Sequence, residues 1–136
     1  MSTMLPDKPS SLIRIALADL KRIEKDPRYR VDMTQWHTPT GGLCRVCLAG
    51  SVIAKTLQSD SLKYVTANYY SQRERLKFYA LNEFRLGNIQ GGLIHMGIDI
   101  PYKLLYGVPI CEYSRDPEQF HRDMAELANL LEENSL

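Results

Sequence analysis

The sequence lacks any apolar run close to the roughly 20 residues that a membrane-spanning helix needs. Its N-terminus, MSTMLPDKPSS, also lacks the apolar core of a secretory signal peptide. Neither a membrane span nor an export signal is therefore indicated. We expect a cytoplasmic protein that has no membrane partner.

A strong net charge is also absent, because 17 Lys and Arg residues are matched by 16 Asp and Glu residues, for a net charge of +1. The chain as a whole should not be attracted to nucleic acid or to anionic membranes. Charge is nevertheless uneven. Residues 63–85 hold five Lys or Arg and two Glu, a net of +3, whereas residues 116–136 hold six Asp or Glu and one Arg, a net of −5. This polarity could orient a protein partner or a second copy of the chain, although two differently charged solvent faces are the simpler interpretation.

Cysteine is scarce, with three residues, and an odd number in a cytoplasmic chain indicates thiols rather than disulfides. Cys44 and Cys47 have the C-x-x-C spacing of a zinc site, and His37 lies upstream at a distance that could supply a third ligand. A fourth ligand would have to be His95, Cys111 or His121. The sequence has no second C-x-x-C and no H-x-x-x-H, and the residues after Cys47 read as an apolar helix. We therefore predict neither a metal nor another cofactor.

What the sequence does contain is helical periodicity, without internal repeats. We expect a flexible N-terminus, residues 1–9, and one compact, mainly α-helical domain, residues 10–136, with about five helices and at most a minor β element. A first helix should be capped by Ser10 or Ser11 and end at Asp26-Pro27, because the residue before proline avoids the helical conformation. Its inner stripe is predicted to consist of Ile13, Ala16, Leu17, Leu20 and Ile23.

The remaining helices are predicted from their ends and their apolar faces. The segment 28–42 has no regular period and should be a loop, and a short helix should span 88–96. Ser71 and Glu74 form a capping box at the start of another helix. The inner face of that helix is predicted to hold Leu76, Tyr79, Ala80 and Phe84. Asp116 and Pro117 begin the last helix. Its buried stripe is predicted to consist of Phe120, Met124, Leu127 and Leu131.

The stretch GGLCRVCLAGSVIA, residues 41–54, leads into a predicted second helix, residues 43–57. Cys47 lies on its apolar face, where cysteine usually behaves as a small hydrophobic residue. Gly50 lies on the same face and would allow another helix to approach closely. We therefore predict that this helix is part of the tightly packed core.

Cys44 admits a second interpretation, because the dipole of a helix favours the thiolate form of a cysteine in its first turn. GGLCRVCLA resembles the Gly-x-Cys helix start of transglutaminase-like and papain-like enzymes over these few residues. The resemblance implies that Cys44 is a nucleophile, with a downstream histidine as base and an Asp or Asn to orient it. His95 and Asp99 would take these roles, but no sheet is predicted to hold them. A cysteine-dependent enzyme therefore stays an alternative, ranked below a non-enzymatic protein.

The basic helix at residues 71–86 suggests a further alternative, nucleic-acid binding. Its sequence mixes arginine, lysine and aromatic residues, as a surface for phosphates and stacked bases would. However, Glu74 and Glu83 interrupt the basic face, and Tyr79 and Phe84 fit the predicted buried stripe. Nucleic acid therefore ranks below a protein as the partner of this helix.

Three segments, DPRYRVDMTQWH, CRVCLAGSVIAKTL and ALNEFRLGN, are together similar to small, uncharacterised helical proteins of bacteriophages and prophages. The resemblance implies no catalytic residues, and it implies a protein of the bacterial host cytosol that binds a host or defence protein. We therefore expect a non-enzymatic protein-interaction module, such as a phage-encoded inhibitor of a host or defence complex. Its partner-binding residues are expected to be Arg73, Arg75, Lys77, Arg85 and Trp36.

Overall fold

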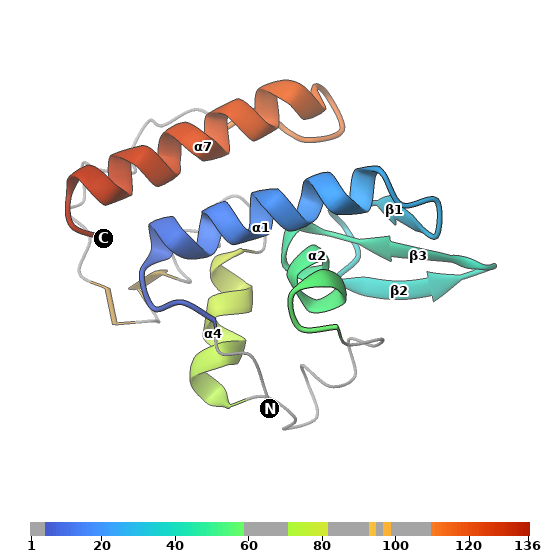
Figure 1. Cartoon of the computed structure of the whole chain (residues 1–136), viewed down its shortest axis with the longest axis horizontal. Helices are drawn as coiled ribbons and strands as arrows, with labels where there is room; N and C mark the ends of the chain where they lie inside the picture. Colours follow the sequence, from blue (N-terminus) through green and yellow to red (C-terminus); the bar gives the residue numbers. More distant parts are fainter. Residues whose placement is uncertain (1–4, 59–70, 82–92, 95–96, 99–109) are drawn as a thin grey trace.

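The structure is a computed structural model that describes residues 5–58, 71–81, 93–94, 97–98 and 110–136. Within these residues it contains four helices and one three-stranded sheet (Figure 1). The described part is therefore a mixed α/β fold, and the prediction of helices with a minor β element is confirmed only in this coarse form. The predicted helix at 88–96 falls largely outside the described residues. Among the described helices, none combines the length and the apolar character needed to cross a membrane.

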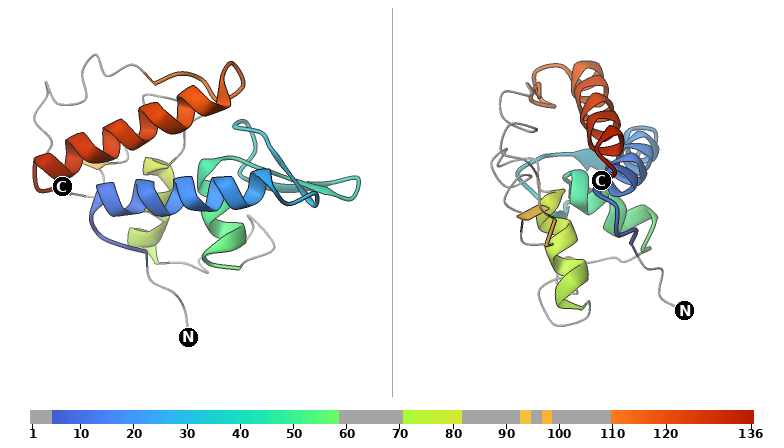
Figure 2. Two further views of the ribbon diagram at one scale, coloured as in Figure 1. Left: turned by 45° about the horizontal axis from the view of Figure 1, so that its top comes forward. Right: turned by 90° about the vertical axis from the view of Figure 1, so that its left-hand side faces the viewer.

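Helix α1 (Pro9–Glu24) lies in the middle of the molecule, between α7 (Pro117–Glu133) on one side and α2 (Leu48–Lys55) with the sheet on the other (Figures 1 and 2). Its predicted inner stripe is confirmed, because all five of those residues are buried. The predicted cap is wrong. The helix begins after Lys8 with Pro9 in its first turn, and the buried Ser10 hydroxyl donates instead to the carbonyl of Leu136 at 2.7 Å.

Helix α7 runs antiparallel to α1 and follows its sequence prediction closely. The Asp116 carboxylate accepts a hydrogen bond from the backbone N–H of Gln119 at 3.1 Å, and Pro117 occupies the first turn. The predicted stripe faces α1, and its four residues are fully buried, which stabilises the fold by roughly 1.5–3 kcal/mol for each large apolar side chain. Arg14 of α1 forms an ion pair with Glu132 and a hydrogen bond with Asn129, so the two helices are also held at their surface.

The segment predicted to be a loop and the start of the predicted second helix together form the sheet. Strand β3 (Leu43–Val46) lies in the centre, parallel to β1 (Tyr29–Val31) and antiparallel to β2 (His37–Thr40). Gly41 and Gly42 connect β2 to β3 with φ values of 59° and 89°. A two-residue hairpin turn of this kind needs positive φ at both positions, which only glycine adopts without strain. The two glycines therefore belong to a hairpin, and the prediction of a helix from residue 43 is wrong.

Helix α2 begins five residues later than predicted, at Leu48, because Cys47 is its cap. The Cys47 Sγ accepts a hydrogen bond from the backbone N–H of Gly50 at 3.4 Å. The prediction that Cys47 is buried is confirmed. Gly50 is indeed a point of close approach, but its neighbour is the backbone of Trp36 and not another helix.

Helix α4 (Gln72–Ala80) begins where it was predicted, because the Ser71 hydroxyl accepts a hydrogen bond from the Glu74 N–H at 3.3 Å. Its predicted inner face is largely wrong. Ala80 is buried, but Tyr79 is 51% exposed, and Phe84 lies outside the described residues. The residues that α4 does bury are Glu74, Lys77, Phe78 and Ala80, followed by Leu81 just beyond its end.

Candidate functional site

The structure brings together two regions that the sequence singled out separately, Trp36 and the basic helix. The ring of Trp36 lies against that of Tyr79 on α4, with the centroids 5.7 Å apart and the planes at 83°. Edge-to-face contacts of this kind stabilise an aromatic pair by about 0.5–1.5 kcal/mol beyond the buried area. Trp36 is half-buried against the core, whereas half of Tyr79 is exposed to solvent. The pair therefore presents an aromatic surface that is anchored at one side.

The backbone of Trp36 is fixed by its contacts with Cys47 and Gly50. Its carbonyl oxygen accepts a hydrogen bond from the Cys47 N–H at 3.3 Å, just where β3 passes into α2. Gly50 packs so closely that a Cβ atom there would lie 1.5 Å from this oxygen. Asp32 shapes the preceding turn by accepting hydrogen bonds from the backbone and hydroxyl of Thr34. These contacts fix the Trp36 backbone, so little conformational freedom would be lost there on binding a partner.

Arg75 and Leu76 lie four and three residues before Tyr79, so they share its face of α4. Both side chains are half-buried. From here on, the term aromatic surface means the four residues Trp36, Arg75, Leu76 and Tyr79. Tyr79 could not be recognised as a surface residue from the sequence, because its position in the helical pattern favours a place in the core. Its neighbour Phe78 occupies the buried position instead.

The prediction that Lys77 is a partner-binding residue of an exposed basic face is wrong, because its side chain is fully buried. Its Nζ donates to the Leu5 carbonyl at 2.9 Å, to Asp7 Oδ1 at 3.0 Å and to Glu74 Oε1 at 3.0 Å. The second oxygen of Glu74 accepts a hydrogen bond from the Leu5 N–H at 3.2 Å. A buried ammonium is tolerated only when its charge and its protons have partners, and here all three protons do.

Arg73 is exposed, as predicted, but its guanidinium forms an ion pair with Asp7 at 2.9 Å. The hydrogen bond and charge of Lys77, and more weakly the charge of Arg73, hold the pKa of Asp7 below its usual value. On this helix three cations, Arg73, Arg75 and Lys77, therefore stand against two carboxylates, Asp7 and Glu74. Arg85 lies outside the described residues. The basic face that nucleic-acid binding would use is largely neutralised in this part of the chain.

The structure removes the helix-dipole argument for Cys44 as a nucleophile. Cys44 lies in the middle of the central strand β3, where its backbone N–H donates to the Arg28 carbonyl at 2.9 Å. It is not at a helix N-terminus, so no helix dipole favours its thiolate. His95 and Asp99, its expected partners, lie outside the described residues.

The three candidate zinc ligands also have separate positions. His37 is buried in β2, with its ring 6.2 Å from that of Tyr29, Cys44 is in β3, and the Cys47 sulfur caps α2. The three cysteines of the chain form no disulfide. Over the described ranges, no cluster of three or more His, Cys, Asp or Glu side chains has an arrangement that could hold a metal ion.

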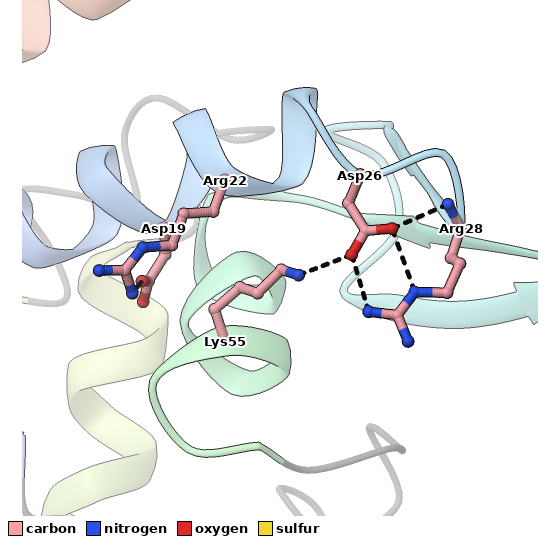
Figure 3. Close-up of polar contacts among 5 residues, drawn as sticks. All are labelled: Asp19, Arg22, Asp26, Arg28 and Lys55. Atoms are coloured by element: carbon pink, nitrogen blue, oxygen red, sulfur yellow. Dashed lines mark hydrogen bonds and ion pairs between the residues drawn. The ribbon is translucent and has the colours of Figure 1, made fainter.

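A second polar cluster joins the end of α1 to β1 and α2 (Figure 3). The Asp26 carboxylate accepts two hydrogen bonds from the Arg28 guanidinium, one from the Arg28 backbone N–H and one from Lys55 Nζ at 2.7 Å. Arg28 first, and then Lys55, hold the pKa of Asp26 far below its usual range. All of these groups are occupied with one another, so the cluster acts as a structural anchor.

Asp19 lies beside this anchor, but its pKa is shifted in the opposite direction from that of Asp26. Its carboxylate is buried, accepts a hydrogen bond from the Thr56 hydroxyl and pairs with Arg22 at 3.2 Å (Figure 3). Burial raises the pKa of Asp19, although the hydrogen bond from Thr56 and the charge of Arg22 act against that shift. This group couples α1 to the end of α2.

Glu24 at the end of α1 binds the segment that leads into α7. It accepts a hydrogen bond from the Tyr113 hydroxyl at 2.6 Å and lies 3.0 Å from His121 Nε2. Burial, and then the hydrogen bond to Glu24, raise the pKa of Tyr113. The Tyr113 ring also packs edge-to-face on Phe120, so this cluster closes one end of the helix pair.

No family model, curated protein or solved structure matches the chain. The case for a functional site therefore depends on the chain's own geometry. Of the polar and aromatic groups described above, the aromatic surface is the one whose large apolar atoms stay open to solvent. The other clusters pair most of their polar groups internally, although the buried Nδ1 of His121 has no hydrogen-bond partner among the described residues.

Proposed function

We propose that the protein is a non-enzymatic interaction module that binds a protein partner through its aromatic surface. The observation that carries this proposal is the exposed ring of Tyr79 packed on the anchored ring of Trp36. Residues that dominate the energy of protein interfaces are most often Trp, Tyr and Arg, grouped at the centre of the contact. Trp36, Tyr79 and Arg75 supply all three types at one place.

The chemistry of the surface favours a partner with an apolar centre and an acidic rim. An aromatic pair contributes most when it enters an apolar pocket and is shielded from water. Arg75 belongs to this surface, and Arg73 lies on the same helix, where Asp7 already pairs with it. Charges at an interface rim mainly speed association and make it sensitive to salt. The resemblance to small phage-borne proteins supports a host or defence protein as this partner, with the chain acting as its inhibitor.

The proposal is tested by quantitative capture of partners from a bacterial lysate, with the intact chain and two variants as baits. Tyr79→Ala should remove the partner that the unchanged chain retains, because truncating a central interface residue typically costs about 2 kcal/mol or more of binding energy. Ile94→Ala is the matched control, because Ile94 is an equally exposed apolar residue, at 57% against 51% for Tyr79. Urea unfolding of both variants should stay close to that of the unchanged chain.

Nuclease treatment of the lysate separates the two classes of partner. A protein partner should be retained after nuclease, in a stoichiometric amount, by the unchanged chain and by Ile94→Ala. Loss of all bound material on nuclease treatment, or equal capture by Tyr79→Ala, would contradict the proposal.

A further inference from the structure

The segment before α1 is bound to α4 in an extended form. It runs from the start of α1 to the side of α4 (Figures 1 and 2). Leu5 precedes Pro6 and Lys8 precedes Pro9, and a residue before proline is restricted to extended conformations. Lys8 accordingly has φ −76° and ψ 126°. The sequence therefore presets the shape in which this segment meets α4.

Helix α4 contacts both the backbone and the side chains of this segment, as peptide-binding sites do. Glu74 accepts from the Leu5 N–H and Lys77 donates to the Leu5 carbonyl, so one residue has both backbone groups bound. The Leu5 side chain is only 3% exposed and belongs to the buried cluster that includes Phe78. Two residues on, Asp7 pairs with Lys77 at 3.0 Å and Arg73 at 2.9 Å.

We infer that this side of α4 is a recognition site for an extended peptide with a leucine followed two residues later by an acidic residue. In the structure the site is occupied by the chain's own residues 5–7. Without an occupant, the fully buried Lys77 ammonium would keep the Glu74 carboxylate as its only partner among the described residues. A buried charge that loses its partners is strongly unfavourable, so release of the segment is favourable only when an equivalent peptide replaces it.

This site is distinct from the aromatic surface and goes beyond the proposed function. Successive residues of a helix are rotated by about 100°, which places Lys77 and Tyr79 on opposite sides of α4. A partner that presents a leucine and an acidic residue at this spacing would compete with the N-terminal segment. Such a partner can bind only the chains in which the segment is released, so its apparent affinity falls in proportion to that fraction. The segment therefore acts as a built-in competitor.

The test uses a fluorescent peptide of residues 2–8, STMLPDK, and the full-length chain. Peptide anisotropy should reveal tighter binding to the variants Leu5→Ala and Asp7→Asn than to the unchanged chain, by about tenfold or more, because each variant weakens the internal competitor. The same leucine and aspartate substitutions made in the peptide should weaken binding to the Leu5→Ala chain by about tenfold or more. Circular dichroism of each variant checks that the fold persists.

Two outcomes would overturn the inference. One is a Leu5→Ala chain that does not bind the peptide, and the other is a peptide whose leucine and aspartate can be replaced without loss of affinity. Tyr79→Ala serves as the control, because it should leave peptide binding unchanged while it removes the captured protein partner. Failure of the peptide site and failure of the aromatic surface are therefore distinguishable.

Discussion

The α1–α7 pair and helix α4 are stabilised in different ways. Between α1 and α7, apolar stripes at helical spacing meet, and the polar contacts lie at the margins. Helix α4 instead buries a lysine and a glutamate and exposes a tyrosine. The difference indicates that the helix pair is built for stability, whereas α4 combines a held segment on one side with an exposed aromatic surface on the other.

The largest effect is expected where the two regions differ most, at Lys77. Lys77→Met keeps the volume of the side chain but leaves the Glu74 carboxylate buried without its ion pair, so it should lower the free energy of unfolding by about 3–5 kcal/mol. Urea unfolding measures this change. If α4 were stabilised mainly by apolar packing, as α1 is, methionine at position 77 would leave the free energy of unfolding nearly unchanged. An unchanged unfolding midpoint would therefore contradict the account of α4.

A smaller effect is expected at Gly50, which fixes the position of Trp36. Gly50→Ala would place a Cβ atom 1.5 Å from the Trp36 carbonyl oxygen, so the backbone must move. The expected loss is about 3 kcal/mol, and it should be accompanied by a shift in the emission of Trp36, the only tryptophan. Gly42→Ala is the control. Its Cβ meets nothing within 4 Å, so it should cost only about 1–2 kcal/mol for positive φ and leave the emission unchanged.

Mild acid should have the smallest of these effects on stability, and comparison with Asp7→Asn should isolate the part of it that belongs to α4. The pKa of Asp7 is lowered in the folded chain, so its contribution to stability is present above its unfolded pKa of 3.8 and is lost as the pH falls through the folded value. Lys77 then loses one acceptor. Below about pH 4 the unchanged chain should therefore lose more of its free energy of unfolding than Asp7→Asn, which has already lost this contribution at neutral pH. Urea unfolding of both chains at neutral and acid pH measures the difference, and an equal loss in the two chains would refute the assignment.

The helix pair could be predicted from the sequence because the information for it is local. Residues at steps of three and four form the stripes of α1 and α7, and Asp116 with Pro117 fixes where α7 begins. The capping box at Ser71 was readable for the same reason. A pattern within a single segment was enough in each case.

The sheet and the buried face of α4 depend on contacts between distant segments. The two glycines at 41 and 42 are compatible with a helix start or a hairpin, and the antiparallel pairing of β3 with β2, beside β1, makes them a hairpin turn. Lys77 is buried because Leu5 and Asp7, some seventy positions away, satisfy it. Nothing in the sequence around Lys77 signals this partner, so the helix was given the wrong inner face and Tyr79 was assigned to the core.

The central claim, that the Trp36–Tyr79 pair is the binding surface, is tested most directly by titrating the captured partner into the chain while recording Trp36 emission. The account predicts a spectral shift that saturates at a stoichiometric ratio, and its loss in Tyr79→Ala at the same concentrations. Calorimetry that detects binding of the partner while the Trp36 emission stays constant would contradict it.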